Sequence, residues 1–133
     1  YMLASDIVAK MASIEERTSK NDGLTLCVAL SYGGRQEITA AAKKIAQLVK
    51  NGDLRPEDVD CDTFASMLYT AGMPEPDLLI RTSGEQRISN YLLWQLAYSE
   101  MYFSPTLWPD FSKAELEEIV KDFNSRERRY GKS

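Results

Sequence analysis

Two arginines lie close together in a polar loop of an otherwise acidic chain. Arg81 ends a short apolar run, and Arg87 and Ser89 follow it across a glycine-containing loop, just before the next apolar segment. A guanidinium group matches phosphate oxygens with a planar, bidentate fork, and a serine hydroxyl adds another hydrogen-bond donor. The spacing therefore indicates a site for a phosphate or diphosphate. A purely structural network, in which the arginines pair with neighbouring acids, explains the same residues equally well (Glu75, Asp77, Glu85).

Other polar residues give weaker signals. Glu100 begins a later apolar segment, and a carboxylate near an arginine loop could hold Mg²⁺, which takes one or two carboxylates together with phosphate oxygens. A plain surface glutamate is the simpler interpretation. The basic tail at 126–132 is more typical of a solvated terminus than of a binding element.

The composition excludes several kinds of chemistry. The chain has no histidine, which removes Ser-His and Cys-His catalysis and histidine acid–base chemistry. Cys27 and Cys61 lie far apart without a nearby histidine, so a zinc site is excluded and we expect buried thiols rather than a disulfide. The net charge of -4 over 133 residues opposes general binding to nucleic acid or to anionic lipid.

The length suits one domain, and no stretch is long and apolar enough to span a bilayer. The start does not have the pattern of a signal peptide. Because Tyr1 precedes Met2, we expect the chain to be cut from something longer, or processed.

Apolar periodicity predicts an alternation of helices and strands. Helices are expected over residues 2–19, 36–51, 62–71 and 90–99. A fifth helix is expected to begin at a capping box formed by Ser112 and Glu115. Strands are expected over 24–30, 77–80 and 100–104, the first with the apolar run of a strand buried on both faces. This order predicts an α/β fold with a mostly parallel sheet flanked by helices.

A sheet of about three strands would expose buried-type residues at an edge, so we expect it to be part of a larger sheet. Ligands of such sheets bind beyond the carboxyl ends of the strands. Two polar loops are expected there, at 31–35 and 81–89. The paired glycines of the first loop permit close backbone approach.

Residues 77–100, DLLIRTSGEQRISNYLLWQLAYSE, closely resemble the C-terminal signature of the cis-prenyltransferases, the undecaprenyl diphosphate synthase family. The resemblance continues in LWPDF at 107–111, RERRYG at 126–131 and SYGGR at 31–35, and it covers essentially the whole chain. The family has a six-stranded α/β sheet, of which this chain would supply about three strands. An unrelated phosphate-binding domain would leave so long a match unexplained.

The resemblance implies a reaction. Family members extend an allylic diphosphate, such as farnesyl diphosphate, with isopentenyl diphosphate, form cis double bonds and require Mg²⁺. By position, Arg81, Arg87 and Ser89 would bind the diphosphate of isopentenyl diphosphate, and Glu100 would bind Mg²⁺. Arg35 would help shape the active site as a catalytic residue.

The end of the chain also resembles a family motif. Arg129 and Gly131 would belong to a terminal Arg-X-Gly sequence that reaches the partner's site in a homodimer. Two positions depart from the family pattern, since many members have Asn where this chain has Ser31, and some have His where it has Gln86. The first departure weakens any role for residue 31, and the second argues against proton acceptance at residue 86.

Family members are much longer than this chain. Their N-terminal half carries the phosphate loop for the allylic diphosphate, a catalytic aspartate and most of a hydrophobic tunnel, and none of these has a counterpart here. Residues 1–133 are therefore expected to be the C-terminal half of a single domain, inactive when alone. We also expect a cytoplasmic location, with at most peripheral membrane association through a lipid product.

The alternative is a non-catalytic partner subunit of a heteromeric cis-prenyltransferase. Such partners typically lose the arginine, serine and glutamate set, which this chain retains. That retention favours the catalytic lineage.

Overall fold

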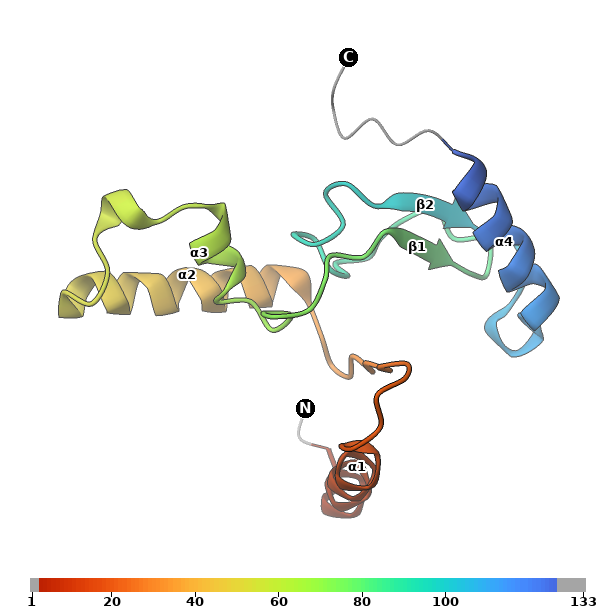
Figure 1. The fold of residues 1–133 in the computed structure, drawn as a ribbon, viewed down its shortest axis with the longest axis horizontal. Coiled ribbons are helices and arrows are strands. Elements are labelled where there is room, and N and C mark those ends of the chain that lie inside the picture. The colour runs from red at the N-terminus through yellow and green to blue at the C-terminus, as the bar shows by residue number, and fades with distance from the viewer. Residues whose placement is uncertain (1–2, 127–133) are drawn as a thin grey trace. The chain divides into compact units, whose positions relative to one another are not determined.

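The computed structural model describes residues 3–126 and divides the chain into two units, residues 1–32 and residues 33–133, which are described separately (Figure 1). The first unit contains α1 (Ser5–Thr18). The second contains two longer helices, two strands and several shorter elements. In chain order these are α2 (Gly34–Asn51), η1 (Pro56–Asp58), α3 (Cys61–Ala65), β1 (Leu78–Arg81), β2 (Glu100–Phe103), η2 (Trp108–Asp110) and α4 (Lys113–Ser125).

The first unit confirms the expected helix but not the strand after it. No residue of α1 is buried, although Ile7, Val8 and Ile14 form the predicted apolar stripe. Residues 24–30 do not form a strand, and Leu24 and Leu26 are 94% and 81% exposed. The prediction of a buried strand was wrong for this structure. A strand requires hydrogen-bonded neighbours, and within the first unit residues 3–32 supply none to this run.

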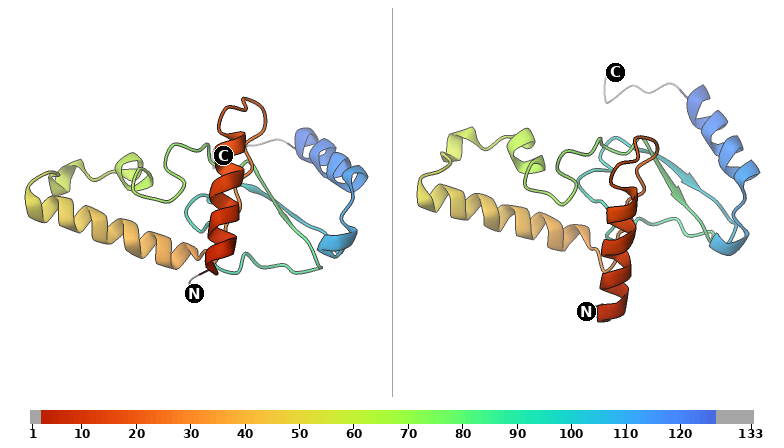
Figure 2. Two further views of the ribbon diagram at one scale, coloured as in Figure 1. Left: turned by 90° about the horizontal axis from the view of Figure 1, so that it is seen from below. Right: turned by 60° about the horizontal axis from the view of Figure 1, so that its bottom comes forward.

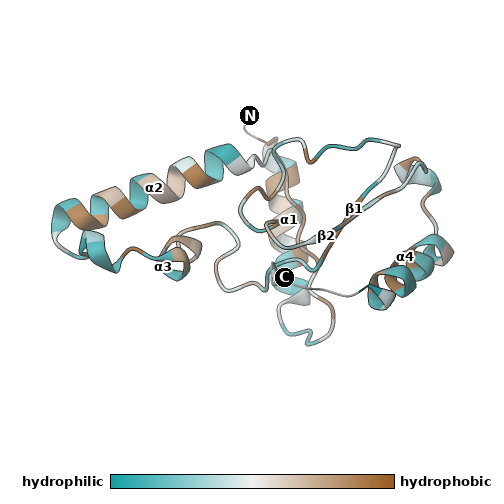
Figure 3. Ribbon diagram, turned by 90° about the horizontal axis from the view of Figure 1, so that it is seen from above, coloured by the Kyte–Doolittle hydropathy of each residue, from teal (hydrophilic) through white to brown (hydrophobic). Residues whose placement is uncertain are grey.

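Helix α2 follows its sequence signals closely. Ala41 and Ile45 are buried on one face, and Gly52 caps the end with a φ of 82°, in the left-handed region that suits glycine. Figure 3 shows apolar and polar residues alternating along this helix, as its periodicity predicts. Its other buried side chain is the carboxylate of Glu37, which periodicity did not predict.

Helix α3 is shorter than expected. It covers only Cys61–Ala65, and turns replace the remainder of the predicted helix at 62–71. Asp60 caps its start by accepting a hydrogen bond from the Thr63 N–H at 2.8 Å. Beyond its end, the Ser66 hydroxyl donates to the Thr63 carbonyl, a local bond that competes with helix continuation. Lys44 of α2 donates to the Met67 carbonyl at 3.2 Å, so this segment lies alongside α2 (Figure 2).

The segment predicted as a helix at 90–99 is a series of turns. Ser89, Asn90 and Leu92 have φ values of 47°, 65° and 43°, all in the left-handed region that right-handed helices exclude. These dihedrals explain why the apolar periodicity of this segment does not produce a regular helix. Leu96 is nevertheless buried, as the pattern predicted.

The two described strands form a parallel pair, which confirms the α/β class. Leu78 lies opposite Glu100, and Arg81 lies opposite Phe103. Helix α4 runs antiparallel to β2, because Glu115 near its start accepts a hydrogen bond from Ser104 while Arg126 just past its end pairs with Glu100. Two strands are found among residues 3–126 where about three were expected, because residues 24–30 do not form a strand.

Helix α4 begins where the capping signal predicted, since the Ser112 hydroxyl accepts a hydrogen bond from the Glu115 N–H at 3.2 Å. The Glu115 side chain binds Ser104, so only half of the expected capping box forms. Ile119 is the buried residue of this helix.

Both cysteines are free thiols and exposed, which corrects the expectation that they are buried. None of the helices described between residues 3 and 126 has both the length and the apolar character needed to cross a membrane.

Candidate functional site

The loop that begins after Arg81 is held in place by the chain that follows β2. The Ser83 N–H donates to the Thr106 carbonyl at 2.8 Å, and the Gly84 N–H donates to the Ser104 carbonyl at 2.8 Å. The Ser104 N–H in turn donates to the carbonyl of Arg81 at 2.7 Å, which extends the parallel ladder by one bond. The loop therefore leaves the sheet at the carboxyl end of β1, where ligands of parallel sheets bind, and these hydrogen bonds hold its backbone.

Arg81 and Arg87 line one open pocket of about 390 Å³ at this loop. The pocket wall combines the hydroxyls of Thr82 and Ser83 with apolar and aromatic side chains (Leu79, Ile80, Ile88, Tyr91). Two guanidinium groups, two hydroxyls and no carboxylate in the lining make a surface that suits an anion. The structure thus brings Arg81 and Arg87 to one pocket, and their role in binding an anion stays a prediction.

The two arginines differ in their partners. Arg87 forms an ion pair with Glu85, as the structural-network interpretation predicted. Arg81 is half-buried, and within residues 3–126 no carboxylate pairs with it. Glu85 of the same loop therefore neutralises the charge of Arg87, whereas Arg81 remains available to an anion.

Ser89 does not line the arginine pocket. It is exposed, and its φ of 47° is uncommon for a residue with a side chain. Strained backbone of this kind concentrates at ligand sites. The structure thus places Ser89 on the same loop as the arginines but outside the pocket they share.

Arg35 also lies outside the arginine pocket. It is exposed in the first turn of α2 and borders a separate hollow that includes Gln36 and Lys43. The link between this turn and the arginine loop is Asn90, which had no predicted role. Its side-chain carbonyl accepts from the Arg35 N–H at 2.8 Å, and its backbone carbonyl accepts from the Gly34 N–H at 2.7 Å.

Gly34 permits this close approach. A Cβ at residue 34 would lie 2.9 Å from the Leu93 Cγ and 3.0 Å from the Leu93 backbone nitrogen, too near for a side chain. The glycine pair had suggested such an approach, and an asparagine directly after Ser89 was the available signal for its partner. Asparagine tolerates the left-handed conformation that Asn90 adopts.

Glu100 is held by an ion pair. Its carboxylate accepts from Arg126 Nη1 at 3.0 Å, while Arg126 Nη2 contacts Asp122 at 2.6 Å. The hydrogen bond with Glu100, followed by that with Asp122, raises the pKa of the Arg126 guanidinium. Both Glu100 and Arg126 are about one-third exposed, so the pair can exchange with solvent ions.

The donor set around Glu100 allows a limited test of the expected Mg²⁺. No group of three or more acidic, cysteine or histidine side chains suited to a metal exists among residues 3–126. Glu100 can supply a single carboxylate, and diphosphate oxygens can complete the octahedral shell that Mg²⁺ requires. The residues therefore fit a shared metal site rather than a complete protein cage. Arg129 and Gly131, the other predicted site residues, lie outside the described residues.

These features define the class of protein as an α/β fold with an arginine-bearing loop at the carboxyl end of a parallel strand. A family model described as "Putative undecaprenyl diphosphate synthase" matches residues 1–131. The chain belongs to the undecaprenyl diphosphate synthase family.

The curated relatives that match this chain include isoprenyl transferases of two bacteria. An isoprenyl transferase of Chlorobaculum tepidum is 54% identical over 132 residues, covering 99% of this chain and 50% of the relative. An isoprenyl transferase of Geobacter sulfurreducens is 50% identical over 131 residues, covering 98% of this chain and 53% of the relative. The chain thus spans about half the length of these relatives.

Two solved structures support the fold. Lavandulyl diphosphate synthase from Lavandula x intermedia, in complex with dimethylallyl diphosphate, is 42% identical with a TM-score of 0.93, covering 98% of this chain and 56% of that one. A probable undecaprenyl diphosphate synthase from Campylobacter jejuni is 37% identical with a TM-score of 0.79, covering 98% and 58% of the respective chains. The structural neighbours and the family assignment agree.

Proposed function

We propose that this chain supplies the isopentenyl diphosphate site of a cis-prenyltransferase, as the C-terminal half of one catalytic domain over residues 1–133. The observation that carries the proposal is the pocket shared by Arg81 and Arg87, where the half-buried Arg81 guanidinium has no acidic partner within residues 3–126. Family membership supplies the reaction class. The retained arginine, serine and glutamate set argues for this role over that of a non-catalytic partner subunit.

The proposed reaction joins isopentenyl diphosphate to an allylic diphosphate such as farnesyl diphosphate. The allylic carbon–oxygen bond breaks with loss of diphosphate, the double bond of isopentenyl diphosphate forms the new carbon–carbon bond, and one proton leaves to create a cis double bond. Arg81 and Arg87 hold the diphosphate of isopentenyl diphosphate, and Ser89 contributes its hydroxyl. The lack of histidine is compatible with this chemistry, because diphosphate departure depends on charge neutralisation rather than on a nucleophilic side chain.

The ion pair between Arg87 and Glu85 sets a condition on binding. A diphosphate must compete with the Glu85 carboxylate for Arg87, whereas Arg81 can bind it directly. The terminal phosphate, with up to two negative charges, and its bidentate geometry favour the substrate in this exchange. We therefore assign the first contact to Arg81 and the second to Arg87.

Mg²⁺ is the proposed cofactor, and it supplies neutralisation of diphosphate charge when bound. Glu100 would hold it together with phosphate oxygens. Binding requires the Glu100 carboxylate to exchange its contact with Arg126 for the metal. The homodimer, with Arg129 and Gly131 reaching the partner's site and Arg35 shaping the active site, completes the proposal. A cytoplasmic location, peripheral at the membrane through the lipid product, is also proposed.

The experiment is calorimetric titration of the chain with isopentenyl diphosphate in the presence of Mg²⁺. Arg81→Gln is expected to weaken binding at least tenfold, since a lost charge-assisted hydrogen bond is worth about 1.5–3 kcal/mol. Arg55→Gln is the matched control, because Arg55 is an exposed arginine paired with Asp58 far from the loop. Equal affinities of the two variants would overturn the assignment of Arg81.

Turnover is tested separately. The chain alone is expected to be inactive with farnesyl and isopentenyl diphosphates and Mg²⁺. Co-expression with the part of the Chlorobaculum relative that the match does not cover is expected to restore prenyl transfer. Turnover by the isolated chain would contradict the proposal that it is half of a domain.

A further inference from the structure

Residues 88–91 form a tight turn at the wall of the arginine pocket. The Tyr91 N–H donates to the Ile88 carbonyl at 3.0 Å, and both residues line the pocket. Between them lie Ser89 and Asn90, with φ values of 47° and 65°. Turns with two central residues at positive φ normally take glycine, asparagine or aspartate at these places. The conformation is therefore unfavourable for Ser89, and contacts outside the turn are needed to stabilise it.

The contacts that stabilise the turn come from Asn90. Its side-chain Oδ1 accepts from the Arg35 N–H at 2.8 Å, and its backbone carbonyl accepts from the Gly34 N–H at 2.7 Å. Its Nδ2 group donates to Gln36 Oε1 at 3.1 Å. Because a backbone N–H can only donate, the contact with Arg35 determines which way the amide points. Asn90 thus attaches the turn to the first turn of α2.

The start of α2 depends on the same residue. A helix leaves its first N–H groups without intrahelical partners, and Gly33, which precedes α2, provides no side-chain cap. Asn90 satisfies the N–H groups of Gly34 and Arg35 from a position 55 residues beyond Arg35. The first glycine leaves room for it, since a Cβ at residue 33 would lie 2.8 Å from Asn90 Nδ2. The turn and the helix start therefore stabilise each other.

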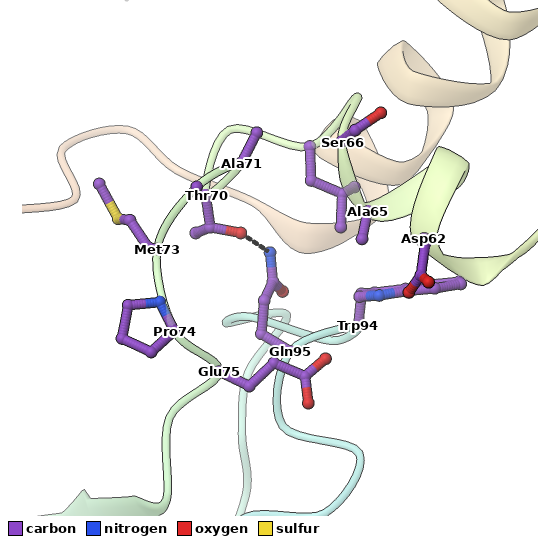
Figure 4. A pocket seen from close by; sticks show the side chains of 12 residues that line it. Asp62, Ala65, Ser66, Thr70, Ala71, Met73, Pro74, Glu75, Trp94 and Gln95 are labelled. Carbon is purple, nitrogen blue, oxygen red and sulfur yellow. Dashed lines mark hydrogen bonds between the residues drawn. The ribbon is translucent and has the colours of Figure 1, made fainter.

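The segment after the turn contacts α2 a second time. Gln95 Nε2 donates to Glu37 Oε2 at 3.1 Å and to Thr70 Oγ1 at 2.9 Å, and the bond to Thr70 is drawn in Figure 4. Gln95 and Glu37 are both buried. Residues 90–95 are therefore attached to α2 at both of their ends, and Asn90 is the attachment nearer to the arginines.

Asn90 also lies next to the proposed diphosphate ligands. Towards the start of the loop, the N–H groups of Ser83 and Gly84 bind the chain after β2. Arg87 and Ser89 come between those bonds and Asn90 in the sequence. Because Ser89 directly precedes Asn90, the dihedrals of the turn determine where the serine hydroxyl lies. Loss of the Asn90 contacts would let the turn relax to right-handed dihedrals and displace that hydroxyl.

We propose that Asn90 is a positioning residue for the isopentenyl diphosphate site, an inference that rests on the function proposed above. In this role Asn90 does not contact the diphosphate. It holds the turn of residues 88–91 in its left-handed conformation, which fixes the place of Ser89 and of the pocket wall at Tyr91. A protein whose binding-competent conformation is only partly populated binds its ligand more weakly by that fraction. The contacts of Asn90 therefore raise affinity through the population of this turn.

Two variants of Asn90 separate its backbone conformation from its side-chain contacts. Asn90→Gly keeps the positive φ, which glycine adopts readily, but removes the amide. Asn90→Asp keeps an acceptor for the Arg35 N–H and tolerates the left-handed conformation. In calorimetric titration with isopentenyl diphosphate and Mg²⁺, Asn90→Gly is expected to weaken binding about fivefold to tenfold, and Asn90→Asp to remain within about threefold of the wild type. Equal affinities of Asn90→Gly and the wild type would overturn the inference.

Asp60→Ala is the matched control. Asp60 also caps a helix by accepting from a backbone N–H at 2.8 Å, but it lies at the start of α3 and does not line the arginine pocket. Its loss is expected to lower stability and to leave the affinity for isopentenyl diphosphate unchanged. Equal losses of affinity in Asp60→Ala and Asn90→Gly would show general destabilisation and overturn the positioning role.

Hydrogen exchange of the Arg35 amide reports on the contact directly. Exchange is expected to quicken in Asn90→Gly and to stay slow in Asn90→Asp and Asp60→Ala. Unchanged exchange in Asn90→Gly would contradict the contact on which the inference depends. Should Asn90→Gly fail to fold, Gln36→Ala removes the bond to Nδ2 at an exposed residue and is expected to weaken binding about threefold. Unchanged affinity of Gln36→Ala would then overturn the inference.

The wild type and Arg81→Gln distinguish this inference from the proposed function. Binding that Arg81→Gln weakens and Asn90→Gly leaves unchanged would overturn the role of Asn90 alone. Absence of binding by the wild type would overturn the proposed function and the role of Asn90 with it.

Discussion

Ser104 is fully buried and connects β2, α4 and the arginine loop. Removing its hydroxyl therefore tests whether these three parts depend on one another. The Oγ atom donates to Glu115 Oε1 and accepts from the Thr106 N–H at 3.0 Å. The Thr106 carbonyl in turn accepts from the N–H of Ser83, two residues after Arg81. Ser104→Ala removes the hydroxyl and leaves both of its partners without that bond.

The expected magnitude follows from these two bonds. A hydrogen bond to a charged group contributes about 1.5–3 kcal/mol and a neutral one about 1 kcal/mol. Glu115 is half-buried and can regain water, which places its contribution at the lower end. We therefore expect Ser104→Ala to lower the free energy of unfolding by about 2–3 kcal/mol.

The assay is urea denaturation followed by tryptophan fluorescence, together with calorimetric titration of isopentenyl diphosphate. Affinity is expected to fall as well, because the loosened Thr106 no longer holds the loop at Ser83. Ser125→Ala is the matched control, since its hydroxyl donates to a carbonyl on the exposed end of α4. If Ser104→Ala and Ser125→Ala unfold at the same urea concentration, the reasoning about Ser104 is refuted. Lost stability with unchanged affinity would refute only its link to the loop.

Three further predictions concern other parts of the second unit. Gly34→Ala is expected to lower the unfolding free energy by about 1–3 kcal/mol by overpacking against Leu93, measurable by thermal denaturation; an unchanged melting temperature would contradict the close approach. Asp60 caps α3 and its pKa is lowered from 3.8, mainly by a hydrogen bond from the backbone N–H three residues on. Its contribution should therefore be present above pH 3.8 and lost as the pH falls through the lower folded-state pKa, so urea midpoints of the wild type and Asp60→Ala should converge in acid. Arg126→Gln is expected to lower the Mg²⁺ concentration that supports isopentenyl diphosphate binding, since the guanidinium competes with the metal for Glu100; a higher requirement, measured by titration at several Mg²⁺ concentrations, would refute the competition.

Local signals predicted the elements whose formation depends on nearby residues. The stop of α2 at Gly52 and the start of α4 at Ser112 both form where expected. Each depends on bonds within a few residues, so a short stretch of sequence contains the necessary information. The prediction of a strand at 24–30 was wrong, because the pairing of a strand depends on partners far away in the chain.

In the candidate site, too, features set by nearby residues were predicted and features set by distant residues were not. The position of Arg81 at the end of an apolar run was enough to place it at the carboxyl end of a parallel strand. The role of Asn90 was not visible, because its partners at the start of α2 lie more than fifty residues earlier in the chain.

The sequence by itself determined the family, the α/β class and the two arginines of one pocket, because these depend on residue types at fixed local spacing. Only the tertiary structure decided that Arg87 is paired with Glu85 while Arg81 lacks such a partner within residues 3–126. It also decided that Arg126 pairs with Glu100, and that Glu115 binds Ser104 instead of completing the capping box. Sequence spacing identifies groups that can interact, but competition among donors and acceptors is settled by their positions in the folded chain.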